Sequence, residues 1–371
     1  MGYGRRYITL DDPSTLEAAR ADPVGMIRDL DRATIDEIQR APSLMLAIKK
    51  SIDEDRRPGR FLVTGSADIM ANRNIQDSMA GRIETLKLLP LSQDELNAQG
   101  PARFLDRLLE SRPFQSITPG RPIAERVLMG GYPEVVTRPS ERRRRDWFAA
   151  YAQAIAERDI PDIATIDRGA DMPRFLALLA TLNGQLVNAS AIGAQIGIDR
   201  KTALRYLGLA EQLFVVRMLP AWSNNALKRL VKSPKLHFID SGLVAGLGRI
   251  GAENLAADRT AFGSLLESFV LAELEKQSAW SDGRYRFSHF RDKDGLEVDI
   301  VAEDEAGRVI GIEFKAAATV RASDFAGLKR LAASTDRFVA GVAFYDGGVS
   351  LQFGEGLRAV PFDALWLPSG A

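Results

Sequence analysis

Hydrophobic and polar positions divide the first hundred residues into alternating strands and helices. Short runs rich in β-branched or aromatic residues are typical of strands, and the four expected strands are residues 6–10, 33–36, 60–66 and 83–89. Helical spacing fills the intervals, as where Leu44, Ile48 and Ile52 mark one face of a helix. Strands that alternate with helices, and that are apolar on both faces, predict a parallel sheet covered by helices.

A different pattern follows. Residues 97–170 look helical, and residues 172–220 resemble a winged helix: three helices, the last two separated by a turn at Gly197, and then a β-branched strand. Asp199 is expected to cap the third helix. Candidates for base or phosphate contacts at the start of that helix are Arg200, Lys201, Thr202 and Arg205. The alternative is a winged helix that serves only as a packing module.

The last part of the chain predicts an α/β domain with acids on its strands. Residues 263–277 form an amphipathic helix in which Glu267 borders the apolar face. Residues 296–301 alternate, so that Asp299 lies on the polar face of a strand, and residues 309–315 return with Glu313 and Lys315 on one face.

The amino-acid composition limits which metal ions, partners and locations are possible for this protein. The 371 residues contain no cysteine and two histidines, so any divalent metal would be bound by oxygen ligands, as Mg²⁺ is. The 49 basic and 49 acidic residues cancel, so a nucleic-acid surface would have to be local. No apolar run is long enough for a membrane span, and the first residues lack the apolar stretch of a signal peptide. We therefore expect a soluble, cytoplasmic protein.

The order of motifs in residues 6–96 resembles a large prokaryotic family of AAA-type ATPases fused to an uncharacterised C-terminal domain. The matching phrases are Leu10–Pro13, Ile35–Gln39, Asp53–Gly59, Leu62–Ser66, Gly81–Arg82 and Leu89–Ser92. The resemblance implies that Asp36 and Glu37 are the Walker B acids, with Asp36 as a Mg²⁺ ligand. It also implies that Thr64 and Ser66 belong to a polar sensor beneath the γ-phosphate, and that Arg82 faces a phosphate or an interface.

One part of that family's ATP site is absent from the sequence. The family places a Gly-x-x-x-x-Gly-Lys-Ser/Thr loop before the Leu-Asp-Asp strand, and no Gly-Lys dipeptide occurs in the 371 residues. We expect that this chain is not a competent ATPase, so ATP remains a doubtful cofactor. Either the true start codon lies upstream or the domain is a degenerate remnant. The missing strand would be the central one, and its loss would leave an apolar slot.

The acids of the last domain resemble the PD-(D/E)xK nuclease core. That resemblance implies that Asp299 and Glu313 bind Mg²⁺, that Glu267 completes the metal shell or orients water, and that Lys315 polarises the nucleophile or stabilises developing charge. Arg291 could meet a phosphate. The alternative is a salt-bridge ladder on the surface of a sheet.

A basic segment precedes this domain. Residues 224–235 contain few acids, and their basic residues are Lys228, Arg229, Lys232 and Lys235. Such a loop could cradle a nucleic-acid backbone, or it could be an ordinary lysine-rich surface.

Together these features predict a multidomain α/β protein. The expected domains are a truncated ATPase-type parallel sheet (1–98), a helical lid or linker (99–170), a winged helix (171–222) and a restriction-endonuclease-like domain (223–371). The predicted role is a Mg²⁺-dependent transaction on DNA or RNA, with homo-oligomeric assembly left open. The alternatives are a non-catalytic interaction protein and an intact ATPase switch with a misassigned start codon.

Overall fold

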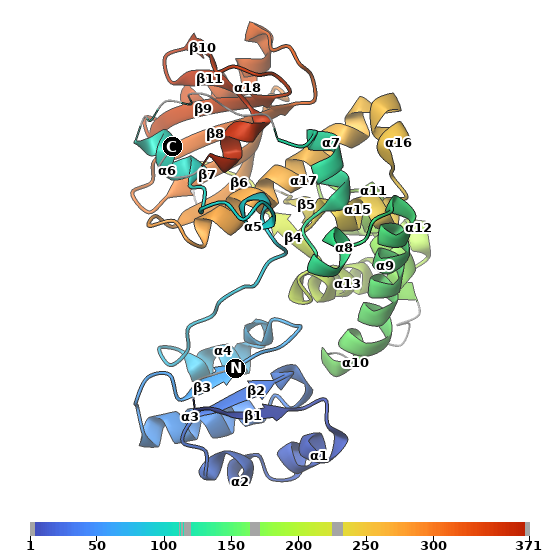
Figure 1. Ribbon diagram of the computed structural model, residues 1–371, viewed down its shortest axis with the longest axis vertical. Helices are drawn as coiled ribbons and strands as arrows, with labels where there is room; N and C mark the ends of the chain where they lie inside the picture. The colour runs from blue at the N-terminus through green and yellow to red at the C-terminus, as the bar shows by residue number, and fades with distance from the viewer. Residues whose placement is uncertain are drawn as a thin grey trace. The chain divides into compact units, whose positions relative to one another are not determined.

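The computed structural model describes residues 4–110, 112, 114, 120–163, 171–224 and 233–367 (Figure 1). The chain divides into two compact units. The first contains residues 1–88, 152–173 and 204–215, and the second contains residues 89–151, 174–203 and 216–371. This division by compactness does not test the four expected domain boundaries, which stay a prediction.

The first unit is built on a three-stranded parallel sheet. Its strands β1 (Arg6–Thr9), β2 (Ala33–Asp36) and β3 (Phe61–Val63) lie in the order β1-β2-β3. The expected fourth strand at residues 83–89 is wrong, because this segment pairs with no strand among the described residues. A strand forms only where a neighbour accepts its backbone hydrogen bonds, whatever its side chains favour.

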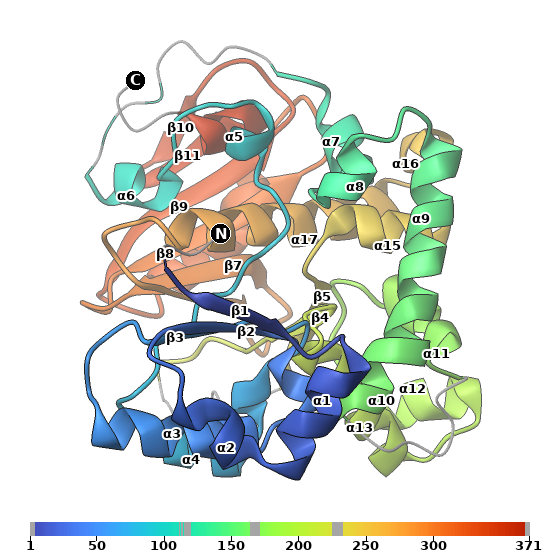
Figure 2. The ribbon, with the colours of Figure 1, turned by 60° about the horizontal axis from the view of Figure 1, so that its bottom comes forward.

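Helices cover one face of this sheet (Figure 2). They are α1 (Pro13–Ala21), α2 (Pro23–Arg28), α3 (Leu44–Glu54) and α4 (Arg73–Met79), with the short 3₁₀ turns η1 (Ile38–Arg40) and η2 (Ile69–Ala71) between them. On the other face Tyr7, Thr34 and Leu62 form one row across the strands, and Tyr7 and Leu62 are 63% and 50% exposed. The expectation of a sheet covered on both faces is therefore not met along this row.

The region expected to be helical, residues 97–170, is mainly helical where it is described. After α5 (Gln93–Leu96), its elements are α6 (Phe104–Leu109), α7 (Ile123–Met129), α8 (Pro133–Val136), α9 (Glu141–Ala154), η3 (Ile155–Asp159) and α10 (Ile160–Ile163). Next come α11 (Met172–Thr181), α12 (Ala189–Ile196) and α13 (Arg200–Gln212). The turn at Gly197 is left-handed (φ 75°), and Asp199 accepts hydrogen bonds from the first backbone N–H groups of α13, as expected.

The second unit is built on a six-stranded mixed sheet in the order β10-β11-β9-β8-β7-β6. Its strands are β6 (Tyr285–Arg291), β7 (Glu297–Asp304), β8 (Val309–Lys315), β9 (Phe338–Tyr345), β10 (Leu351–Gly354) and β11 (Leu357–Pro361). Strands β6, β7 and β8 form an antiparallel meander, and β8, β9 and β11 run parallel. The hairpin expected from residues 296–315 is thus confirmed.

Helices and a small hairpin complete this unit. Its helices are α15 (Ser241–Gly248), α16 (Ala252–Ala257), α17 (Arg259–Ser278) and α18 (Ala326–Ala332), with the 3₁₀ turns η5 (Ala322–Phe325) and η6 (Phe362–Trp366). Helix α17 packs against β7 and β8, and α18 packs against β7, β8 and β9. Strands β4 (Val216–Leu219) and β5 (Lys235–Phe238) form a separate antiparallel pair.

Candidate functional site: an acid cluster on the C-terminal sheet

Three carboxylates predicted from the sequence meet in the second unit, where Glu267 and Glu313 are buried and the Asp299 side chain is 22% exposed. Asp299 lies on β7 and Glu313 on β8, and these strands pair with Ile300 opposite Ile312, so the two acids are neighbours. Their carboxyl groups share a hydrogen bond. The backbone N–H of Phe314 also donates to Oδ2 of Asp299 (3.3 Å). The two residues that the resemblance to a nuclease core grouped therefore lie side by side, and α17 adds Glu267 beside them.

Lys235 of β5 holds the cluster together. Its ammonium lies 2.8 Å from Oε1 of Glu267, 3.8 Å from Oδ1 of Asp299 and 3.9 Å from Oε2 of Glu297. The side chain is 8% exposed, which differs from the expected basic loop facing a nucleic-acid backbone. A buried ammonium requires opposite charges around it, and the acids of α17 and β7 supply them.

Burial and crowding change the acidity of these carboxyls. Burial, and then the neighbouring charge of Glu267, raise the pKa of Asp299 to about 6. Burial, and then the charge of Asp299, raise the pKa of Glu313 well above its ordinary value. Burial also raises the pKa of Glu267, although Lys235 opposes that shift. A bound cation would favour the ionised form of these carboxyls and so offset the rise in their pKa values.

The remaining predicted residues lie at the edge of the cluster. Nζ of Lys315 is 3.9 Å from Oε2 of Glu313 and 3.9 Å from Oδ1 of Asp324, and the side chain is one-third exposed. Nη1 of Arg291 is 3.2 Å from Oε1 of Glu297, and that side chain is half exposed. Lys315 thus reaches from the buried Glu313 towards solvent, and Arg291 lies against the partly exposed Glu297.

A layer of buried polar side chains lies beside Glu267. The fully buried His237 of β5 shares a hydrogen bond between its Nδ1 and Oγ of Ser268 (2.8 Å), and Ser268 donates to Oδ1 of Asn183 (2.9 Å). Nε2 of His237 lies 3.4 Å from Oε1 of Glu267. Burial lowers the pKa of His237 well below its ordinary value, so the imidazole is neutral at pH 7.

Buried polar contacts also fix the far end of α17. Glu273 accepts hydrogen bonds from the backbone N–H of Gln93 (2.9 Å), from Nε1 of Trp366 (2.7 Å) and from Nζ of Lys276 (2.9 Å). Segments on either side of α17 in the sequence are thereby tied to one side chain. The helix that presents Glu267 is held rigidly, which a preorganised site requires.

Sequence reasoning missed the role of Lys235 and the layer beneath it. A signal was available: Lys235 and His237 are polar residues two positions apart in a strand whose other residues, Leu236 and Phe238, are apolar. That spacing places both polar side chains on one face. All four residues of β5 are buried, so the polar face required buried partners.

The candidate nucleic-acid residues of α13 lie mostly at the surface. Arg200, Lys201 and Arg205 are exposed, whereas the hydroxyl of Thr202 donates to Oδ2 of Asp199 (2.6 Å) and serves the helix cap. The other candidates, Lys228, Arg229 and Lys232, lie outside the described residues.

Most of the expected nucleotide residues gather at the carboxyl ends of β2 and β3. Oδ2 of Asp36 accepts a hydrogen bond from the hydroxyl of Tyr7 (2.6 Å), and Oδ1 accepts one from the hydroxyl of Thr64. The bond from Thr64, and then the bond from Tyr7, lower the pKa of Asp36. Glu37 adopts a left-handed backbone (φ 59°). Its carboxylate and the hydroxyl of Ser66 both accept from the side-chain amide of Gln39.

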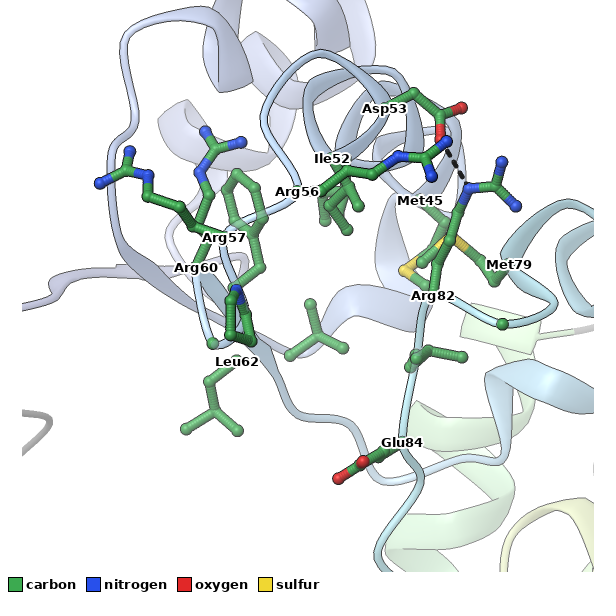
Figure 3. A pocket seen from close by; sticks show the side chains of 17 residues that line it. Met45, Ile52, Asp53, Arg56, Arg57, Arg60, Leu62, Met79, Arg82 and Glu84 are labelled. Carbon is green, nitrogen blue, oxygen red and sulfur yellow. Dashed lines mark hydrogen bonds and ion pairs between the residues drawn. The ribbon is translucent and has the colours of Figure 1, made fainter.

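Arg82 lies elsewhere. Its Nε donates to Oδ1 of Asp53 on α3 (2.7 Å), and both residues line a cavity beside β3 (Figure 3) that none of the residues around Asp36 lines.

Three families match successive parts of the chain. Residues 4–97 match an AAA domain, residues 121–254 match a domain of unknown function (DUF8612), and residues 262–365 match a second domain of unknown function (DUF4143). Uncharacterized protein Rv2008c of Mycobacterium tuberculosis and uncharacterized protein Mb2031c of Mycobacterium bovis are each 30% identical over 322 residues. The match covers 86% of this chain and 67% of each relative. This chain belongs to their family.

Membership in this AAA-domain family confirms the resemblance of the N-terminal part and leaves the activity open. No solved structure matches the chain. Among the described residues, no helix combines the length and the apolarity needed to cross a bilayer. The winged helix, the nuclease-like core and the site residues stay predictions.

Proposed function

We propose that the C-terminal unit of this AAA-domain family member is a nuclease-like domain that acts on nucleic-acid phosphodiesters with Mg²⁺. The observation that carries the proposal is the meeting of Glu267, Asp299, Glu313 and Lys315, which come from one helix and two adjoining strands. A surface salt-bridge ladder would not place carboxyls where burial raises their pKa values.

The donor set suits Mg²⁺ only in part. Among the described residues, no three histidine, cysteine or carboxylate side chains form a group that could hold a metal alone. Mg²⁺, however, is commonly held by one or two carboxylates, with water and substrate phosphate completing its shell. Asp299 and Glu313 fit that pattern, since both are oxygen donors with raised pKa values that a cation would offset. When bound, the ion would supply an activated water and charge stabilisation at phosphate.

The chain's own residues would take the remaining roles. Lys315 is the cation nearest the acid pair that also reaches solvent, so its Nζ is placed to stabilise charge on a phosphate oxygen. Arg291 is half exposed near the same edge and would bind a neighbouring phosphate. Exposed Arg200, Lys201 and Arg205 on α13 would add sequence-independent contacts to the nucleic-acid backbone.

One observation favours a second candidate, a non-catalytic interaction protein. Lys235 already provides the acid cluster with a buried cation, so the cluster could be a structural ion network. In that case the domain would keep the nuclease-like arrangement without the reaction.

A cleavage assay separates the two candidates. The full 371-residue chain is incubated with branched and linear DNA with Mg²⁺ or with EDTA. We expect Mg²⁺-dependent cleavage that falls at least about a hundredfold in Asp299→Ala and in Lys315→Ala, as expected when groups that stabilise the transition state are removed. The matched control is Asp304→Asn, a buried acid at the far end of β7 that pairs with Arg308 instead. Cleavage that survives both cluster substitutions would refute the proposal, and no cleavage by the wild type would favour the non-catalytic candidate.

A further inference from the structure

Two lysines approach the acid cluster, and they differ in what they can reach. Nζ of Lys315 is 3.9 Å from Oε2 of Glu313, and its side chain is 33% exposed. Nζ of Lys235 is 2.8 Å from Oε1 of Glu267, and its side chain is 8% exposed. Lys315 can therefore meet a substrate, whereas Lys235 faces carboxylates inside the protein.

The ammonium of Lys235 lies where a second metal ion would have to bind. Asp299 shares a hydrogen bond with Glu313, and these two acids are the expected ligands of a first ion. In two-metal sites the ions lie about 3.5–4 Å apart, so one carboxylate can bind both. A second ion would therefore bind Asp299 together with Glu267 or Glu297. Nζ of Lys235 is already among these three acids, 3.8 Å from Oδ1 of Asp299 and 3.9 Å from Oε2 of Glu297.

Protein groups also enclose the carboxylate of Glu267. Oε1 faces Nζ of Lys235, and Nε2 of the buried His237 lies 3.4 Å from the same oxygen. Oε2 faces the backbone of Gly184, where an added Cβ would lie 3.4 Å from it. Mg²⁺ usually keeps several waters, and both oxygens of Glu267 are next to protein groups instead. We therefore expect Glu267 to act through Lys235 and not as a metal ligand.

The charges of the cluster balance with one divalent ion. Within the described part of the chain, its ion pairs join five carboxylates to three cations, which are Glu267, Glu297, Asp299, Glu313, Asp324, Lys235, Lys315 and Arg291. When all are ionised, two negative charges remain, and one Mg²⁺ offsets them. A second Mg²⁺ would leave two positive charges in excess at a largely buried site, which is unfavourable away from water.

We propose that Lys235 takes the place of a second metal ion, so that the acid cluster binds one Mg²⁺ through Asp299 and Glu313. This inference rests on the proposed function, because it requires a metal at the acid pair. Lys235 is then a positioning residue, whose ammonium keeps Asp299 beside Glu267. Contact with the substrate phosphate is left to the ion and to the more exposed Lys315.

Counting the bound ions tests the proposal. The full chain is titrated with Mn²⁺, which prefers the same oxygen ligands as Mg²⁺, and free Mn²⁺ is measured by its electron paramagnetic resonance signal. Ions that the wild type binds and Asp299→Asn does not are assigned to the cluster. We expect one such ion per wild-type chain and one more in Lys235→Met, because that variant frees the place of the ammonium. Adding Glu267→Gln to Lys235→Met is the matched control, and it should remove the extra ion.

The outcomes separate this inference from the proposed function. Two cluster ions in the wild type would overturn the role of Lys235 and leave the proposal of a metal at the acid pair standing. A folded Lys235→Met that gains no ion would do the same. If the wild type binds no ion at the cluster, the metal proposal fails and this inference fails with it.

Chemical labelling of the wild type gives a readout that does not depend on whether a variant folds. Acetic anhydride acylates accessible lysines, and mass spectrometry of the digested chain measures each site. The one-third exposed Lys315 is the internal control, measured without Mg²⁺. Lys235 should be labelled at least about tenfold more slowly than this control, both with and without Mg²⁺, because its ammonium stays enclosed. Labelling of Lys235 that rises to the rate of the control when Mg²⁺ is added would show that the ion displaces the ammonium, which contradicts the proposal.

Discussion

At the scale of residues, the ammonium of Lys235 lies 2.8 to 3.9 Å from the carboxylates of Glu267, Asp299 and Glu297. Replacing a buried charge while its partner stays leaves that partner unpaired, which commonly costs about 3–5 kcal/mol. We expect Lys235→Met to lose free energy of unfolding of about that size, measured by urea denaturation. Mg²⁺ should restore part of the loss if Asp299 and Glu313 bind it, since a bound ion stabilises the folded state.

The double variant Lys235→Met with Glu267→Gln is the control for this prediction. It removes both members of the 2.8 Å ion pair, so it should unfold at a higher urea concentration than Lys235→Met alone. If Lys235→Met is as stable as the wild type, the ammonium does not hold the cluster together. Stability of Lys235→Met that Mg²⁺ leaves unchanged would argue against a metal at the acid pair.

The acid pair itself predicts a pH dependence. Burial raises the pKa of Asp299 to about 6 and that of Glu313 well above its ordinary value, so both acids bind protons more tightly in the folded state than in the unfolded state. Their contribution to stability is complete below about pH 4, the range of ordinary carboxyl pKa values, and is lost as pH rises through 6 and above. Other groups facing the pair are Lys235, Glu267 and Lys315.

Glu313→Gln isolates this effect. The amide can still donate to Asp299 but cannot ionise, so the variant should match the wild type near pH 5 and exceed its free energy of unfolding by about 2 kcal/mol at pH 8. Urea denaturation at both pH values measures the difference. Asp94, whose pKa burial raises to about 6, titrates in both proteins and cancels in the comparison. A variant that differs from the wild type equally at pH 5 and pH 8 would show that the pair does not titrate as described.

At the scale of elements, the sequence pattern correctly predicted those features that depend on interactions between residues close together in the chain. The hairpin of β7 and β8 followed from strict alternation, and the cap at Asp199 followed from residue type alone. These features depend on contacts between residues close together in the sequence, and the local residue pattern contains that information. Alternation in two successive strands was therefore enough to predict that Asp299 and Glu313 lie side by side.

The failures at this scale all depend on distant partners. Residues 83–89 have strand-like side chains, but a strand also needs a backbone neighbour, and the described chain provides none. Lys235 appeared to belong to a basic surface loop, yet its partner Glu267 lies on a helix 32 residues away. Such contacts depend on how elements pack, and residue patterns along one segment do not contain that information.

At the scale of the whole molecule, family membership and geometry answer different questions. The AAA domain and the mycobacterial relatives establish descent, but those relatives are uncharacterized, so they transfer no activity. A fold can host many functions, and a function must be argued from its site. The acid cluster of the second unit accordingly carries the proposal of phosphodiester chemistry.

The same reasoning applies to ATP. The resemblance to AAA-type ATPases assigns Asp36 and Glu37 as the metal-binding and catalytic acids, and each oxygen of Asp36 accepts a hydrogen bond, one from the hydroxyl of Tyr7 and the other from the hydroxyl of Thr64. The 371 residues also contain no Gly-Lys dipeptide, so the backbone cradle and lysine of a phosphate-binding loop are missing from the sequence. Charge-assisted hydrogen bonds contribute roughly 1.5–3 kcal/mol each. Losing four or five removes about 8 kcal/mol, which equals the free energy of micromolar binding.

We therefore expect this 371-residue chain to show no ATP turnover above background in a phosphate-release assay, and no saturable binding of fluorescent ATP at micromolar concentration. Glu37→Gln is the matched variant, because it removes the expected water-orienting acid and keeps the side-chain shape. It should be indistinguishable from the wild type in both measurements. Turnover by the wild type that Glu37→Gln abolishes would mean that another part of this chain binds the phosphates.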